Sequence, residues 1–318
     1  GMDLQPDLTW IKNRDATDSH CWFDSNRGVT KLISSDSTAV EVTDADTLKS
    51  WTSDGYTVGA DVKVNTSGED YASWNWRVNG GTTSTLTAGT INTVTQVNTA
   101  AGFSIMQYVG DGNWGTGGDT ITLAHGLGAA PEFLVVKDRD SNSNNNEWQA
   151  WHIGIGFTNY FYLSTTAASA ASVEVSAVSS TLITITTEQA WGKTWTESGD
   201  NYIGYAWTGV EGFSKFGKYE GNGNANGTFV YCGFRPAWIM TKSIDSTSSW
   251  QIFDDKRLGY NVDNNELVAE AVTAEATTDM IDILSNGFKL RIATDPNVSE
   301  TYVYAAFAHN PFQYATAR

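Results

Sequence analysis

Cysteine is almost absent from this chain, which has two such residues, Cys21 and Cys232, among 318. Each lies within an apolar, strand-like run, and the two occupy different places in the repeats described below. No disulfide framework or thiolate metal site is therefore available. We expect two buried, free thiols, which behave as small apolar side chains.

Basic residues are also scarce, with 19 Lys and Arg against 36 Asp and Glu and a formal net charge of −17. This balance argues against nucleic acid and anionic membranes as partners, because both attract basic patches. An acidic surface that keeps the protein soluble is the plain interpretation. No run approaches the ~20 apolar residues of a spanning helix, and no signal sequence stands at the start. We therefore expect no membrane insertion, and Gly1 before Met2 is typical of tag removal.

Catalytic motifs are missing as well. No G-x-S-x-G motif occurs, and none of the four histidines lies in an H-E-x-x-H frame. The stretch "WGKT" from Trp191 lacks the upstream glycine of a phosphate loop, and "DRDSNSNNNE" from Asp138 lacks the central glycine of a calcium loop. Neighbouring acids such as Asp44 and Asp46 have no specificity in so acidic a chain. We expect no enzyme, no catalytic residue, no metal and no cofactor.

The chain does contain one phrase that is written three times. Each copy has a proline, a lysine six residues later and an aspartate nine residues later, followed by an aromatic or histidine anchor. A second phrase has a tyrosine with an aromatic residue five positions later. The members are Pro6, Lys12, Asp15, His20, Tyr71 and Trp76; Pro131, Lys137, Asp140, Trp148, Tyr202 and Trp207; and Pro236, Lys242, Asp245, Trp250, Tyr302 and Phe307.

Only the second and third copies begin with a head phrase, "GFSIMQYVGDG" from Gly102 and "GFSKFGKYEGNG" from Gly212. The first copy lacks it. Either the chain is a fragment of something longer, or the missing strands come from elsewhere. The Thr-rich connector, residues 81–101, is interpreted as a hairpin or extended segment that covers the exposed edge of the first copy.

The period of the pattern predicts strands. Alternate apolar residues recur in each phrase, with β-branched and aromatic types and with Asp-Gly, Asn-Gly and Ser-Gly breakers between them. We predict an all-β fold of tandem β-sandwich modules, jelly-roll or lectin-like, from three internal repeats with the first incomplete: 2–80, 102–211 and 212–318. The alternative packs all three copies around a pseudo-threefold axis as one body. The nearest candidate for a helix is Asn264–Ala276.

The recurring residues have a structural interpretation. Each lysine stem is expected to cover the core while its ammonium reaches water or the aspartate three residues on. Each recurring tyrosine is expected to tie a strand to a loop through its hydroxyl. What appears in one copy only, in a loop, is the better candidate for function.

The second copy has such a loop, "EQAWGKTWTESGDN", from Glu188. We expect Trp191 and Trp195 to be exposed there, beside Glu197 and Asp200, with Trp114 in a further loop of the same copy. These five residues are the predicted ligand-binding set, because indole faces with nearby carboxylates suit sugar rings. The alternative is that the indoles belong to the core or cover loop ends.

The phrases "WIKNRD", "GFSKFGKYEGNG", "GFRPAWIMTK", "LSNGFKLR" and "YVYAAFAHNPFQYA" resemble a repeat module of tail-fibre and other virion proteins of marine bacteriophages. The resemblance covers nearly the whole chain and implies a structural or receptor-contacting role on a phage tail. It implies other virion or tail proteins as partners, a host-surface glycan or receptor as a further one, and the virion as location. A homotrimer is an expectation for a fibre, although no heptad run is present to drive it. The alternatives are a carbohydrate-binding module of a secreted or surface bacterial protein, located outside the cell or at its surface, and, less favoured, a polysaccharide depolymerase.

Overall fold

The computed structural model describes residues 4–112, 120–140, 146–186, 193–257, 261 and 265–309. Strands dominate this part of the chain. Its helical segments are single turns, α1 (Val62–Asn65), α2 (Lys193–Thr196) and a 3-10 turn at Ile153–Ile155. The predicted all-β class is confirmed.

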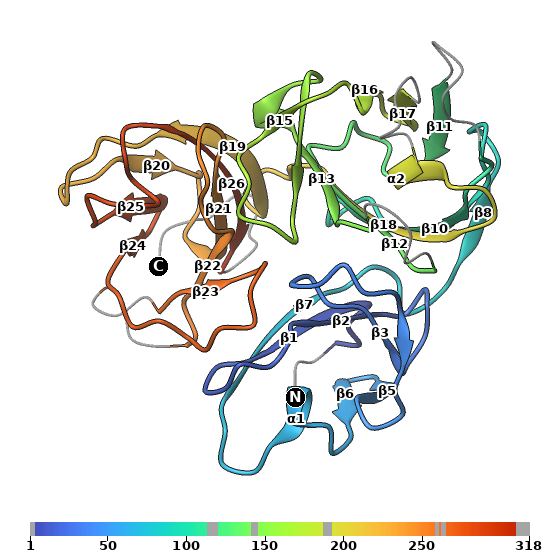
Figure 1. Ribbon diagram of the computed structural model, residues 1–318, viewed down its shortest axis with the longest axis horizontal. Coiled ribbons are helices and arrows are strands. Elements are labelled where there is room, and N and C mark those ends of the chain that lie inside the picture. The colour runs from blue at the N-terminus through green and yellow to red at the C-terminus, as the bar shows by residue number, and fades with distance from the viewer. Residues whose placement is uncertain are drawn as a thin grey trace.

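The strands form three units, which appear as three lobes in Figure 1. The first unit has an inner sheet of order β2-β1-β7, covered by two short hairpins and α1. Its strands are β1 (Leu8–Asn13), β2 (Cys21–Asp24), β3 (Lys31–Leu32), β4 (Val42–Thr43), β5 (Leu48–Thr52), β6 (Gly55–Val58) and β7 (Tyr71–Trp76).

The middle unit has an inner sheet of order β15-β14-β13-β12-β18-β10-β9-β8 and an outer sheet of order β11-β17-β16. The inner strands are β8 (Ser84–Leu86), β9 (Thr93–Asn98), β10 (Phe103–Val109), β12 (Phe133–Asp138), β13 (Gln149–His152), β14 (Asn159–Tyr162), β15 (Ala170–Ala171) and β18 (Asn201–Trp207). The outer strands are β11 (Thr120–Ala124), β16 (Val175–Val178) and β17 (Leu182–Thr186).

The third unit has an inner sheet of order β19-β26-β21-β22-β23 and an outer sheet of order β20-β25-β24. The inner strands are β19 (Ser214–Glu220), β21 (Pro236–Ser243), β22 (Gln251–Asp254), β23 (Leu267–Val268) and β26 (Thr301–Ala308). The outer strands are β20 (Phe229–Tyr231), β24 (Ile281–Leu284) and β25 (Gly287–Leu290).

One three-stranded arrangement, in which a long strand lies between a hairpin partner and a late strand, occurs in all three inner sheets. It comprises β2-β1-β7, β13-β12-β18 and β22-β21-β26. The register is also shared, because the paired residues are Leu8 and Trp76, Phe133 and Trp207, and Trp238 and Phe307.

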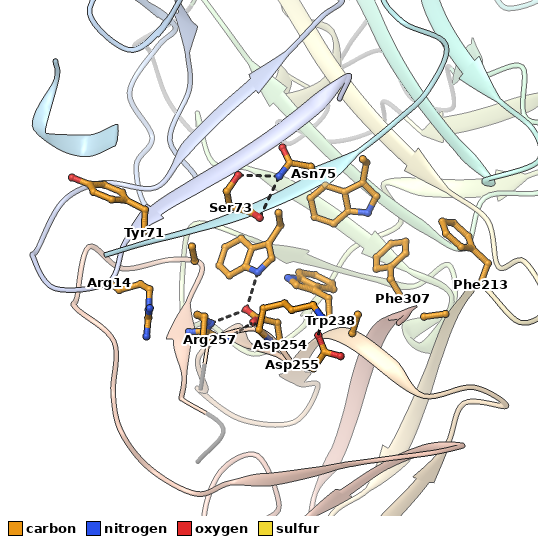
Figure 2. A pocket seen from close by; sticks show the side chains of 16 residues that line it. Arg14, Tyr71, Ser73, Asn75, Phe213, Trp238, Asp254, Asp255, Arg257 and Phe307 are labelled. Atoms are coloured by element: carbon orange, nitrogen blue, oxygen red, sulfur yellow. Dashed lines mark hydrogen bonds and ion pairs between the residues drawn. The ribbon is translucent and has the colours of Figure 1, made fainter. Parts of the chain in front are cut away.

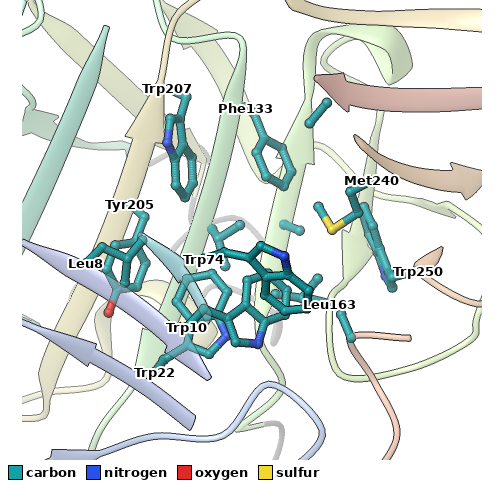
Figure 3. Packing of buried hydrophobic residues seen from close by; sticks show 14 of the residues in the cluster. Leu8, Trp10, Trp22, Trp74, Phe133, Leu163, Tyr205, Trp207, Met240 and Trp250 are labelled. Atoms are coloured by element: carbon teal, nitrogen blue, oxygen red, sulfur yellow. The ribbon is translucent and has the colours of Figure 1, made fainter. Parts of the chain in front are cut away.

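The central strands of the inner sheets are buried on both faces, which explains why β1 and β12 are buried throughout and β21 at every residue except Ala237. One face of each packs on its own outer layer, so that Ile11, Leu134 and Ile239 lie in three separate apolar clusters. The opposite faces of all three sheets meet in a single core, where Trp10, Phe133 and Met240 come from different units (Figure 3). Each inner sheet thus carries an outer layer on one face, and the opposite faces of all three sheets share one core.

The anchor residue of each repeat joins neighbouring units. The indole N–H groups of Trp148 and Trp250 donate to the carbonyls of Ser34 and Tyr162, at 2.8 and 2.9 Å. His20 Nε2 lies 2.9 Å from the carbonyl oxygen of Val268. The first unit thus contacts the third, the third contacts the middle, and the middle contacts the first, so the cycle closes.

The expectation for the recurring lysines is wrong. Lys12, Lys137 and Lys242 are completely buried, and their ammonium groups donate to backbone carbonyls rather than reaching water. Lys137 Nζ lies 2.6 Å from Asn146 O and 3.1 Å from Thr38 O of the first unit. Burial lowers the pKa of Lys137 and of Lys242 to about 8.

The recurring aspartates accept hydrogen bonds from backbone N–H groups at the start of the late strand in each unit. Asp15, Asp140 and Asp245 accept the backbone N–H groups of Asp70, Asn201 and Thr301, at 2.6, 2.8 and 2.7 Å, where the late strand of each unit begins. The tyrosine expectation is confirmed for two members: Tyr71 Oη donates to Val62 O, and Tyr202 Oη accepts from Glu197 N.

Two further expectations need correction. The connector does form a hairpin, β8 with β9, but β9 pairs with β10 of the middle unit instead of covering the first unit. The short turn after Asn98 returns the chain directly beside β10, so local pairing prevails. The helix expected at Asn264–Ala276 is wrong, because Leu267 and Val268 pair with β22 as an edge strand.

Candidate functional site

A groove of about 560 Å³ runs along β7, between the first and third units. Its walls are β7 on one side and the ends of β21, β22 and β26 on the other (Figure 2). A volume of this size is in the range of sites that hold small ligands or segments of chain.

The alternation of β7 decides which side chains form the wall. Ala72 and Trp74 point into the shared core, whereas Ser73 is exposed and Asn75 partly so. Trp76 is partly buried and packs against the edge of that core. β7 therefore turns its indoles toward the shared core, and the hydroxyl of Ser73 and the amide of Asn75 toward the opposite face.

Aromatic rings form the apolar part of the groove. Trp76 lies 5.7 Å from Trp238 and 5.6 Å from Phe307, measured between ring centroids, both in edge-on geometry. Trp238 and Phe307 are 5.6 Å apart, and Phe213 follows at the far end beside Phe307 (Figure 2). Such rings offer flat apolar surface for a sugar face or for apolar side chains.

Ion pairs form the polar end. Asp254 Oδ2 accepts the indole N–H of Trp74 at 2.9 Å and Arg257 Nε at 2.7 Å (Figure 2). Arg257 also bonds Glu275, which receives two hydrogen bonds from Arg14 of the first unit, at 2.9 and 3.0 Å. Burial raises the pKa of Glu275, but the hydrogen bonds of Arg14 and Asn265 and the charge of Arg257 more than offset this, and the net shift is downward.

The same ion cluster occurs at one other junction. Asp24 accepts from Arg27 and from the hydroxyl of Tyr205, while Glu41 bonds Arg27 and Arg139. Asp24 and Arg27 occupy the positions in the first repeat that Asp254 and Arg257 occupy in the third. At the third junction the corresponding side chains are largely apolar or neutral: His152, Ile155, Ser169 and Ile244.

Asp255 is the carboxylate of the groove with free acceptor capacity. Its side chain is 4% exposed, and Oδ1 has no hydrogen-bond partner in the described residues, although Lys256 Nζ lies 3.8 Å away. Oδ2 contacts His309. Because Asp254 is already bound by Trp74 and Arg257, and Asp255 is buried, these two carboxylates do not form an exposed pair in the groove. In the described residues no group of three His, Cys, Asp or Glu side chains could hold a metal ion.

The predicted ligand-binding set is not brought together in the described residues. Trp191 and Trp114 lie outside them. Trp195 is wrong as an exposed residue: it is 1% exposed and packs between the sheets of the middle unit. Glu197 and Asp200 remain partly exposed in the turn before β18. Burial, with the neighbouring Asp138, raises the pKa of Asp200 to about 6.

Trp195 has a buried partner instead of a ligand. Its indole N–H donates to Glu174 Oε2 at 3.0 Å. Glu174 is 3% exposed, and burial raises the pKa of its carboxyl group to about 7, while the indole N–H opposes the shift. This pair fastens α2 to the residue that directly precedes β16, so the indole has the core role that was the alternative expectation.

The groove itself was not predicted. Its rings are members of the repeated phrases, and recurring residues were assigned to scaffold. The available signal was the head phrase that the first copy lacks, because the groove lies along the strand beside which that head would stand.

The molecule is therefore an all-β protein of three joined sandwich units with an aromatic groove between the first and the third. A family model described as a domain of unknown function (DUF7483) matches residues 1–311, and the chain belongs to this family. No curated protein matches the chain, and no solved structure matches it. None of the helices in the described residues is long and apolar enough to cross a membrane.

Proposed function

We propose that the chain is a non-enzymatic structural protein of a bacteriophage tail, one that joins other virion proteins and presents loops to the host surface. The sequence resemblance supplies the virion context. The observation that carries the structural role is the closed cycle of contacts between units, in which the recurring anchors Trp148, Trp250 and His20 each reach into a neighbouring unit. These residues hold a rigid body together.

Purified phage particles provide the test. Mass spectrometry of particles from a host infected with the encoding phage is expected to detect the chain at a copy number typical of tail components. Immunogold labelling is expected to place it on the tail. Particles that lack the chain while it accumulates in the lysate would overturn the proposal.

Carbohydrate binding is the second candidate, because the groove combines partly exposed rings with hydrogen-bonding groups. Trp76 and Phe307 supply ring faces, and Ser73 and Asn75 supply polar atoms. A glycan array with the native chain and with Trp76→Ala tests this candidate. Binding that is lost in the variant favours it. A cleavage assay on the same polysaccharides is expected to release no product.

A further inference from the structure

We propose that β7 is an acceptor for a further β-strand, one whose sequence has the head-phrase pattern of β10 and β19. This inference rests on the structural role proposed above, because it names the partner that such a unit binds. Its geometric basis lies in the two other inner sheets, where the equivalent position is filled.

The late strand of each unit shows the difference. In the middle unit β18 lies between β12 and β10, and in the third unit β26 lies between β21 and β19. In the first unit β7 pairs with β1, and no strand of the described residues pairs with its other side. β7 is thus the edge of a sheet whose two counterparts continue.

The backbone of β7 has groups aimed at that open side. Arg14 N donates to Asp70 O, so the residues of β7 that bond β1 are Ala72, Trp74 and Trp76, by the alternation of an antiparallel ladder. The N–H and C=O groups of Tyr71, Ser73 and Asn75 therefore face away from β1. Unpaired edges of this kind are the usual site of strand addition.

The side chain of Asn75 covers part of the open edge of β7. Asn75 Nδ2 lies 3.3 Å from Ser73 O and 2.9 Å from Ser73 Oγ. At the corresponding places of β18 stand Gly204 and Ala206, which pair with β10. An incoming strand would replace the amide contact with regular ladder bonds.

The register of the filled sites fixes what the donor must carry. Tyr108 of β10 stacks on Tyr202 at 4.9 Å and 6°, and Tyr219 of β19 stacks on Tyr302 at 5.1 Å and 9°. Tyr71 holds the same position in β7. We infer an aromatic residue opposite Tyr71 in the donor, where it would make the third such stack.

The groove fits the remaining donor side chains. In the middle unit Phe103 stacks on Trp207 at 4.7 Å and Ile105 lies opposite Tyr205, both within the shared core. The counterparts of Trp207 and Tyr205 in the first unit are Trp76 and Trp74, which line the groove. Apolar donor residues opposite these two indoles would fill its aromatic end.

The described residues supply no donor of their own. β10 and β19 are both engaged in their own sheets, and the described residues contain no unpaired strand of the head pattern. A further, free strand of the head pattern is the occupant that the register demands.

Binding of synthetic peptides to the full 318-residue chain tests the inference. The probe is the peptide GFSIMQYVG, with GFSKFGKYEG as a second version. The control peptide has proline in place of the methionine that would lie opposite Ser73, because that methionine must offer its N–H to the edge. We expect saturable binding of both probes, seen by calorimetry, and none of the control. Hydrogen exchange of the Ser73 and Asn75 amides is expected to slow on the order of tenfold or more.

Two variants of the chain locate the site. Ser73→Pro removes one N–H from the open side and should abolish binding, and Trp76→Ala should weaken it about tenfold. Tyr231→Ala, an exposed aromatic far from β7 in sequence, is the matched control and should leave binding unchanged. If Ser73→Pro fails to fold by circular dichroism, Trp76→Ala and the exchange data on the native chain still decide the question.

Four results would overturn the inference: no binding of either peptide; binding that Ser73→Pro and Trp76→Ala leave intact; a dimer of the native chain that Ser73→Pro dissociates while peptides fail to bind; or glycan binding that Trp76→Ala abolishes while peptides fail to bind. Failure of the peptides would leave a virion role standing, and absence of the chain from particles would leave strand binding standing.

Discussion

The indole of Trp74 donates a hydrogen bond of 2.9 Å to the carboxylate of Asp254, which lies 180 positions further along the chain. Trp74 belongs to the first unit and Asp254 to the third. The hydroxyl of Tyr205 makes the corresponding contact with Asp24, at 2.7 Å, from the middle unit to the first. These two of the three junctions are thus versions of one design, in which a polar ring group meets a carboxylate held by arginine.

The charge of Glu275 is expected to be essential to one junction. Glu275→Gln leaves Arg14 and Arg257 without their shared counter-charge, and both arginines are largely buried. We expect the free energy of unfolding to fall by about 3 kcal/mol, as is typical when one partner of a buried ion pair is removed. Urea denaturation followed by tryptophan fluorescence measures this loss.

A matched control is Asp46→Asn, which breaks an exposed ion pair with Lys49. That variant is expected to change the free energy of unfolding by less than about 0.5 kcal/mol. The pKa of Glu275 is lowered in the folded state, so its contribution is present above its unfolded pKa and is lost as pH falls through the folded pKa. The free energies of unfolding of the native chain and Glu275→Gln should therefore converge in acid. A constant difference from pH 7 to pH 3 would contradict this account.

The largely apolar junction suggests a replacement for a charged one. Four substitutions copy the third junction into the contact between the first and middle units: Asp24→His, Arg27→Ile, Glu41→Ser and Arg139→Ile. We expect the fourfold variant to lose less stability than Glu41→Gln alone, because it leaves no uncompensated buried charge. Thermal and urea unfolding of both variants would decide, and a fourfold variant that is the less stable of the two would contradict the prediction.

The sequence predicted the strands well because period two is a local property. Leu8, Phe133 and Trp238 stand at one register position in three sheets, as their common place in the repeats indicated. Burial on both faces was not visible in the same way, because it depends on how the three sheets meet. For that reason Lys137 was expected to reach water, whereas its ammonium lies under the first unit.

The contacts between units could not be derived from the sequence. Glu41 and Arg139 are 98 positions apart, and nothing in either neighbourhood marks the other as its partner. The misjudged exposure of Trp195 has a similar cause, because its partner Glu174 lies 21 positions earlier in the chain, directly before β16. The missing head phrase was visible in the sequence, but its consequence needed the sheet order.

The two thiols are expected to resist reagents in the folded protein, and burial of both was predicted from the sequence and is confirmed. Cys21 is 0% and Cys232 is 5% exposed, and both are free. Burial raises the pKa of both thiols, that of Cys232 to about 12. Ellman's reagent at pH 8 should therefore react slowly with the native chain and rapidly with both thiols in guanidinium chloride, since the thiolate is the nucleophile. Rapid reaction of one thiol in the native state would contradict its assigned burial, and Cys21→Ser and Cys232→Ser would identify it.

Glu174 should make the stability of the middle unit depend on pH. Its pKa is raised from 4.5 to about 7 in the folded state, mainly by burial. The unfolded chain releases this proton at lower pH than the folded chain does, so the free energy of unfolding should fall as pH rises from about 4.5 to about 7. The full difference corresponds to about 3 kcal/mol. Glu174→Gln keeps an acceptor for the indole of Trp195 but cannot titrate, so it should flatten this slope and be the more stable protein at pH 8.

Trp195→Phe separates the two effects of the pair. It removes the hydrogen bond to Glu174 but keeps the buried carboxyl group, so its stability should be lower than that of the native chain while the downward slope above pH 4.5 remains. Urea unfolding at pH 4.5, 6 and 8 gives the slopes of all three proteins. Equal slopes for the native chain and Glu174→Gln would show that this carboxyl group does not carry the dependence. A flat profile in Trp195→Phe would contradict burial as the cause of the raised pKa, because loss of an indole N–H that lowers the pKa should keep or steepen the slope.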